Sequence, residues 1–191
     1  QGLLDKKNEY TALYQLLMRA EAPFKAAKVM DYGIKNDFVK DDEKHLKMLA
    51  QGWHMAQELE IAEPIYEKAA KKSEEGELYV FLGQIYLATD RYDLAKDTLK
   101  LGLKKGKLKD PVTVNILLGQ VSYEQQEFED ATKFFRTALD RLTDLKIKDK
   151  KLLEKRQDKL RAQALTWLTY TEKEAKRVKT LELRRKELEE S

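Results

Sequence analysis

Cysteine is absent from this chain of 191 residues, and proline and glycine are scarce. Without cysteine the chain has no disulfides, no thiolate metal sites and no cysteine nucleophile. Only 3 prolines and 8 glycines are present, which predicts few turns and long uninterrupted helices. Pro23, Pro64 and Pro111 are expected beside helix starts, where a missing amide costs little. Alternating β-branched runs are also lacking, so no strands are expected.

No apolar run approaches the roughly 18 residues of a membrane helix, so no direct membrane span is predicted. The chain begins Gln1-Gly2-Leu3-Leu4, without an initiator methionine or a signal peptide. Our interpretation is that it is a trimmed or processed piece of a longer protein.

The charge is unevenly distributed. Hydrophobic residues make up 42% of the chain and charged residues 37%, a composition too apolar for a disordered protein. The net charge is +3, yet residues 144–191 hold 15 basic and 10 acidic side chains, whereas residues 1–143 hold 22 and 24. The positive charge therefore belongs to the C-terminal part.

Three stretches of the chain repeat one another. Small residues recur at Ala62, Ala95 and Ala131, which are 33 and then 36 residues apart. Four further sets of equivalent residues, which we call columns, recur at the same two spacings: Leu49/Leu82/Leu118, Leu59/Tyr92/Phe128, Tyr66/Leu99/Phe135 and Ala69/Gly102/Ala138. A period near 34, with a small residue where two helices cross, is typical of helix–turn–helix arrays.

The repeat and the helical periodicity predict an all-α fold of two parts. Residues 1–143 are expected to form an array of four helical pairs, and residues 144–191 a C-terminal capping and extension helix. The predicted helices cover 3–18, 22–36, 43–57, 60–73, 76–89, 92–105, 111–125, 128–142 and 148–190. The first pair fits the columns only loosely. Beyond Thr171 the last helix has three alternatives: it projects into solvent, docks on the array or pairs with another copy.

The repeated residues resemble a known family. Leu82-Gly83…Tyr86…Ala95…Leu99…Gly102 and Leu118-Gly119…Ala131…Phe135…Ala138 are similar to the tetratricopeptide repeat, and the stretch from Glu43 to Ala69 is a weaker match. The resemblance covers residues 42–142 well and 3–36 in part. It implies a right-handed α-superhelix that binds proteins without catalysing a reaction, but it does not name the partner.

A narrower resemblance rests on three segments: Ala22 to Met30, Gln51-Gly52-Trp53, and Trp167 with Tyr170-Thr171-Glu172. They look like the repeat proteins encoded beside TonB energy-transduction components in Gram-negative bacteria. That likeness implies a periplasmic accessory of the TonB–ExbB–ExbD machinery, with components of that complex as partners. Outside this likeness a cytoplasmic location is the alternative.

The inner face of such a superhelix is lined by the first helix of each pair. Gln51, Gln84 and Gln120 occupy equivalent positions there, and a row of carboxamides can hydrogen-bond the backbone of an extended peptide. The alternative is that glutamine is simply a good helix former on a solvated face. The other candidate groove residues are Lys47, Val80, Leu87, Ile116 and Tyr123, and for Val80 and Ile116 core packing is an equal alternative.

The column of Lys47, Val80 and Ile116 contains only one basic residue. Relatives that clamp a peptide carboxylate carry several basic residues there, so this column argues against a carboxylate clamp. The mixed apolar and polar groove instead suits an apolar peptide or a partner helix.

No catalytic or cofactor constellation is evident. His45 and His54, nine residues apart on one predicted helix, do not share a face, so solvated or hydrogen-bonded histidines are favoured over metal ligands. We find no Ser–His–Asp order, phosphate-binding glycine loop or isolated carboxylate pair. The sequence therefore predicts no enzyme, no metal and no cofactor.

A basic segment begins the last helix. It comprises Lys146, Lys148, Lys150, Lys151, Lys155, Arg156, Lys159 and Arg161. Such a segment binds nucleic acid, anionic lipid or an acidic protein, or it is simply the solvated start of a helix. Because interleaved aromatics and a recognised motif are missing, we predict no nucleic-acid partner.

The favoured hypothesis is a non-enzymatic scaffold of the bacterial envelope that binds a protein or peptide in its concave groove. Two alternatives stay open. One is a structural module that self-associates, as a homodimer, through the C-terminal helix around Trp167. The other is a cytosolic co-chaperone or regulator that binds through Lys150, Lys151 and Lys155.

Overall fold

The computed structural model describes residues 7–190, and within that range the chain is helical and contains no strand. The α-helices are α1 (Lys7–Arg19), α2 (Pro23–Lys35), α3 (Glu43–Met55), α4 (Leu59–Lys72), α5 (Glu77–Ala88), α6 (Tyr92–Lys105), α7 (Pro111–Glu124), α8 (Phe128–Asp140) and α9 (Lys150–Glu189). A short 3-10 turn, η1 (Arg141–Asp144), follows α8. The predicted all-α fold is confirmed.

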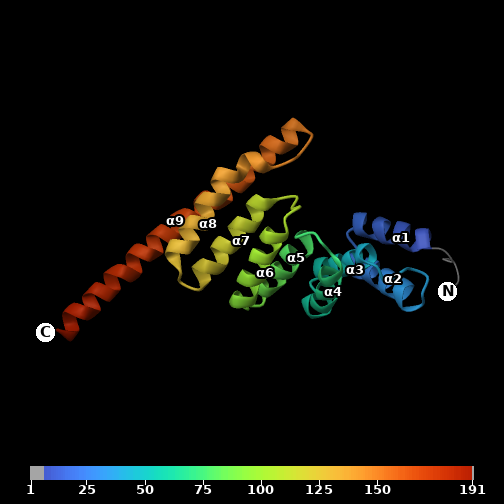
Figure 1. The fold of residues 1–191 in the computed structure, drawn as a ribbon, viewed down its shortest axis with the longest axis horizontal. Coiled ribbons are helices and arrows are strands. Elements are labelled where there is room, and N and C mark those ends of the chain that lie inside the picture. The colour runs from blue at the N-terminus through green and yellow to red at the C-terminus, as the bar shows by residue number, and fades with distance from the viewer. Residues whose placement is uncertain (1–6, 191) are drawn as a thin grey trace.

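The helices pair in chain order and the pairs stack into a solenoid, as Figure 1 shows. The long helix α9 returns along α8 and continues well past the end of the array (Figure 1). Between residues 7 and 190, no helix combines the length and the apolar character that crossing a membrane needs.

The four turns within the pairs are built alike. Each has one residue with a left-handed backbone, namely Glu21, Gln57, Asp90 or Gln126, with φ between 54° and 63°. The next amide reaches back to a carbonyl five residues earlier, as from Glu58 to Trp53 at 2.9 Å, which is the Schellman closure of a helix end. The first pair, which fits the sequence columns loosely, therefore uses the same turn as the others.

Helix crossings are close because the residues there are small. Ala62, Ala95 and Ala131 have no exposed surface, and in the first pair Ala26 has none either. In the fourth pair the close approach needs glycine, since a Cβ on Gly119 would lie 2.5 Å from the Phe135 ring. Side chains of the neighbouring helix fill these spaces as ridges fit grooves.

The buried side chains form two hydrophobic clusters. The first runs from Tyr10 on α1 to Val121 on α7. The second joins α7, α8, η1 and α9, through residues such as Ile116, Phe135 and Leu160. Because α9 shares this second cluster with α7 and α8, the region 144–191 is packed into the array over its first half.

The end of α9 has little contact with the array. Thr171 is buried, and Ala175 and Val178 are half-buried, whereas every residue from Lys179 to Glu190 is exposed. Of the three alternatives for this stretch, projection beyond the array is the one observed in the single chain (Figure 1).

One expectation about proline was wrong. Pro64 lies inside α4, which begins at Leu59, and not beside the helix start. The left-handed Gln57 and the turn after it place the first helical residues earlier than the proline suggests. Pro64 is exposed, so its missing amide leaves an accepting carbonyl on a helix face that water reaches.

Candidate partner-binding groove

The first helices of neighbouring pairs leave a groove between α5 and α7. Its volume is about 140 Å³. Apolar side chains from Val80, Phe81, Leu108 and Val114 lie beside polar ones from Glu77, Gln84, Asp110, Thr113 and Arg156. Ligand-binding grooves typically combine apolar walls with a few convergent polar groups. Two of the predicted residues, Val80 and Gln84, are in this groove.

The three glutamines of the predicted row are all half-buried on α3, α5 and α7. Gln84 lines the groove, and Gln51 and Gln120 occupy the equivalent positions one pair away on either side. In the described part of the chain, none of the three amide groups makes a hydrogen bond, so each can bond an incoming backbone. Peptide binding by this row stays a prediction.

Lys47 reaches the same face from α3. Its Nζ lies 5.8 Å from the centre of the Phe81 ring, within the range of a cation–π contact. Phe81 in turn stacks on Tyr66, with ring centres 5.6 Å apart. Phe81 was not predicted as a groove residue. It adjoins Val80, and its ring contacts the Lys47 ammonium group beside the groove.

Ile116 does not line an open groove. Its exposed fraction is 1%, and it belongs to the second hydrophobic cluster. For Ile116 the core-packing alternative is therefore the correct one. The equivalent Val80 is half-buried and stays accessible.

Tyr123 is covered in part as well. Its ring makes an edge contact with Trp167 of α9, with centres 5.5 Å apart. Leu87, its equivalent on α5, is half-buried against the first cluster. Ile116 is buried and Tyr123 is partly covered because α9 packs on α7 where the next pair of a longer array would lie; groove binding by Tyr123 stays a prediction.

An ion pair closes one end of the groove. Arg156 Nη2 lies 2.5 Å from Asp110 Oδ2 and 3.2 Å from Thr113 Oγ1. Asp110 also accepts the Thr113 amide at 2.9 Å and so caps α7. Sequence analysis placed Arg156 in the basic segment, but the fold uses it inside the groove. An aspartate directly before Pro111 was the available signal for the cap.

The two histidines do not form a metal site. His45 is fully buried, and its Nδ1 lies 2.6 Å from Asp42 Oδ1, although not with the alignment of a hydrogen bond. His54 packs edge-on against Tyr66, and burial lowers the pKa of its imidazole. Among the described residues, no three metal-ligating side chains gather.

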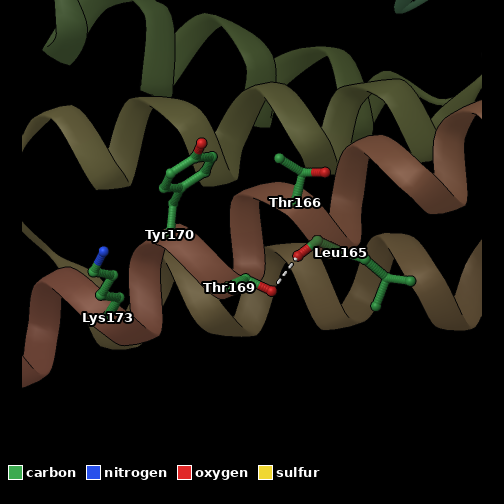
Figure 2. A pocket seen from close by; sticks show the side chains of 5 residues that line it. All are labelled: Leu165, Thr166, Thr169, Tyr170 and Lys173. Carbon is green, nitrogen blue, oxygen red and sulfur yellow. Dashed lines mark hydrogen bonds between the residues drawn. The ribbon is translucent and has the colours of Figure 1, made fainter.

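A second surface lies on the outer side of α9. Leu165 and Tyr170 are 47% and 59% exposed and, with Thr166, Thr169 and Lys173, line a shallow hollow of about 460 Å³ (Figure 2). The Thr169 hydroxyl donates to the Leu165 carbonyl at 2.9 Å (Figure 2), so the hydroxyl is already used. Trp167 faces the other way and stacks on Phe135.

This geometry defines a class: a helical-repeat solenoid with an open groove on its first helices. In the sequence comparison, the tetratricopeptide repeat model matches residues 76–104, which span α5 and α6. The chain thus contains a tetratricopeptide repeat at α5 and α6, within a solenoid of helical pairs. A search of curated proteins finds no sequence that matches it.

Solved structures show the same fold at low sequence identity. MamA from Desulfovibrio magneticus RS-1 is 17% identical, with a TM-score of 0.63 over 93% of this chain and 98% of that one. Pseudomonas aeruginosa PilF is 18% identical, with a TM-score of 0.61 over 86% and 76%. A kinesin-light-chain-like repeat protein from Podospora anserina is 11% identical, with a TM-score of 0.64 over 93% and 91%. These likenesses establish the fold alone.

Proposed function

We propose that this protein is a non-enzymatic scaffold that binds an extended peptide or a helix of a partner protein along α3 and α5. The observation that carries the proposal is the groove beside α5, where the unbonded Gln84 amide lies next to the apolar Val80 and Phe81. Lys47 adds one positive charge to this face. The equivalent face of α7 is less accessible, because Ile116 is buried in the second cluster and Tyr123 contacts Trp167 of α9.

The proposed partner binds by main-chain hydrogen bonds and apolar side chains and not by a terminal carboxylate. In the groove between α5 and α7, the one arginine, Arg156, is already paired with Asp110. A carboxylate clamp needs free cations in the groove, and Lys47 supplies a single one. The mixed groove favours a largely apolar segment.

We further propose the bacterial envelope as the setting, with a component of a TonB-linked transport complex as the partner. The support is the resemblance of Ala22 to Met30, Gln51 to Trp53 and Trp167 to Glu172 to repeat proteins encoded beside such systems. This proposal predicts a periplasmic location.

The test is affinity capture from a bacterial envelope extract. One bait is the unchanged chain, and a second carries Gln51→Glu, Gln84→Glu and Gln120→Glu. A matched control carries Gln57→Glu, Gln126→Glu and Gln163→Glu, which are three amide-to-carboxylate changes at exposed positions on two turns and on α9, outside the groove. Circular dichroism checks that all three baits are folded.

We expect a partner that the unchanged chain and the control retain and the groove variant loses. Capture of TonB-complex proteins would support the envelope setting, and capture of other proteins in the same pattern would support the groove alone. A partner held equally by all three baits would contradict binding by the glutamine row.

A second candidate function is self-assembly through α9. The observation that favours it is the exposed Leu165 and Tyr170 on the outer side of this helix (Figure 2). Leu165→Lys with Tyr170→Lys would then abolish a concentration-dependent increase in mass in analytical ultracentrifugation. A mass that stays monomeric at all concentrations in the unchanged chain would exclude this function. Trp167 is not suited to this test, because it packs inside the second cluster.

A further inference from the structure

Two lysine-rich loops that are distant in sequence meet at one edge of the solenoid. The loop between α6 and α7 contributes Lys107, and the loop between η1 and α9 contributes Lys146. Together they form the rim of a groove of about 460 Å³, which we call the lysine groove. Its floor is apolar and comprises Leu103, Leu108 and Pro111.

The carboxylates at this edge are already engaged. Asp144 pairs with Arg141 at 2.8 Å, and Asp149 accepts the Leu152 amide at 2.9 Å as the cap of α9. Asp110 pairs with Arg156 at 2.5 Å. The arginines therefore offset the charges of Asp144 and Asp110, whereas Asp149 and Glu77 accept backbone amides and keep theirs.

The lysines themselves stay exposed and unpaired. Within the described residues, no ion pair or hydrogen bond involves the side chains of Lys107, Lys109, Lys146, Lys148, Lys150 and Lys151. The exposed carboxylates nearest to them in sequence, Asp144, Asp149 and Glu154, are fewer than the six lysines. Like charges gathered on one edge leave a positive potential that attracts anionic groups.

Both loops are fixed in place, so the groove exists before a partner arrives. The Gly106 carbonyl accepts the Gly76 amide at 2.9 Å, which ties the first loop to the preceding pair. In the second loop Leu145 is buried, and the preceding η1 is held by Gln157 Nε2, which donates to the Leu142 carbonyl at 3.0 Å. A preformed site loses little conformational entropy on binding.

We infer that the lysine groove binds an acidic polypeptide segment that also carries apolar side chains. Acidic side chains would meet the lysines of the rim, and apolar ones would cover Leu103, Leu108 and Pro111. Single-stranded nucleic acids bind where aromatic side chains stack on their bases, and no aromatic residue lines this groove. This groove adjoins the groove beside α5 and shares Leu108 with it, but it contains none of the three glutamines, so the inference stands apart from the proposed function.

The probe is a fluorescent peptide of repeated Glu-Glu-Leu triplets, titrated with the full chain in a fluorescence anisotropy assay. Two control peptides replace either all glutamates by glutamine or all leucines by serine. The test variant is Lys107→Glu with Lys146→Glu. The matched variant is Lys25→Glu with Lys133→Glu, which changes the net charge equally at exposed sites away from this edge.

We expect the test variant to bind the probe about tenfold more weakly, since two attractive contacts become repulsive. The matched variant should bind as the unchanged chain does, and binding should weaken with salt. Both control peptides should bind more weakly than the probe, because each lacks one half of the complementarity.

Four outcomes would overturn the inference: no binding of the probe, equal loss in both variants, equal binding of the glutamine peptide, or no effect of replacing leucine. Preference for single-stranded RNA or for phosphatidylserine vesicles, lost in the same test variant, would reassign the groove to phosphate. Self-association that the test variant alone abolishes would assign it to a second copy of this chain.

Discussion

Helices α5 and α7 occupy equivalent places in successive repeats, yet their inner faces differ. On α5, Val80 stays accessible and Gln84 lines an open groove. On α7, the equivalent Ile116 is 1% exposed, and Tyr123 contacts Trp167. The difference arises from what lies in front of each helix, because α7 faces α9 and not another open repeat.

At the end of a repeat array, the role of repeated positions changes. A terminal helix must bury the apolar face that the last pair exposes. Here α9 does so with Leu160, Ala164 and Trp167. The surface available for recognition is therefore shorter than the repeat count suggests.

The largest expected effect concerns the helix crossings. Ala131→Asp places an unpaired charge at a fully buried position of the second cluster, and we expect a loss of more than about 4 kcal/mol in the free energy of unfolding. Since solenoid units contact mainly their neighbours, hydrogen exchange should rise first in α7, α8 and α9. Ala95→Asp should instead affect α5 and α6 first; identical exchange patterns in the two variants would count against separate clusters.

Trp167→Ala is expected to loosen α9 from α7. The ring stacks on Phe135 and touches Tyr123, so its loss should cost about 3 kcal/mol in urea denaturation. Tyr170→Ala, on the exposed side of the same helix, should change the stability by less than about 0.5 kcal/mol. Similar losses in both variants would mean that α9 does not dock through Trp167.

The first cluster should be sensitive to alkaline pH. Burial raises the pKa of Tyr14 from 10 to about 12 and also raises the pKa of Tyr66. The unfolded chain ionises Tyr14 near pH 10, whereas the folded protein does so only near pH 12. The contribution of the buried tyrosine to the free energy of unfolding is therefore complete below pH 10 and is lost as the pH rises toward 12. For Tyr14 alone this loss is on the order of 2 kcal/mol.

Tyr14→Phe tests this pH dependence. At neutral pH the variant loses the 2.5 Å hydrogen bond to the Met48 carbonyl, at a cost of about 1 kcal/mol. Above pH 10 it should lose less further stability than the unchanged chain. Parallel curves of unfolding free energy against pH would refute the assignment.

The smallest expected effect concerns an ion pair between repeats. Arg91 binds Glu63 of the preceding pair with both terminal nitrogens, at 2.8 and 2.5 Å. Arg91→Lys should cost about 0.5 kcal/mol, because lysine cannot form the paired contact and the site is partly exposed. Arg177→Lys, whose partner Glu174 lies on the same helix, should leave the melting temperature unchanged; equal shifts would contradict a role between repeats.

The fold was largely predictable because each helix pair carries its own signal. Apolar residues at helical spacing, and small residues at Ala62, Ala95 and Ala131, fix the pairs locally. The turns were less visible, since Glu21, Gln57, Asp90 and Gln126 adopt left-handed backbones that glycine usually takes. Hydrogen bonds of the Schellman type hold these residues in place.

The candidate site was predictable only in part, because a repeated column predicts a repeated role. Val80 and Gln84 line the groove as the columns suggest, whereas Ile116 is buried, because its surroundings depend on α9 residues some 45 positions later in the chain. The lysine groove was also hidden, since Lys107 and Lys146 meet only after the chain folds. Long-range contacts of this kind leave no local pattern.

Thiol labelling can compare the accessibility of the equivalent positions on α5 and α7, since the chain has no cysteine of its own. Single cysteines at the equivalent positions, Val80→Cys and Ile116→Cys, would react with a soluble thiol reagent under native conditions. We predict reaction at least about a hundredfold faster at position 80, because position 116 reacts only after local opening. Adding Trp167→Ala should remove most of this protection. Equal rates at the two positions, or protection at 116 that survives the loss of Trp167, would contradict the conclusion that α9 closes this end of the groove.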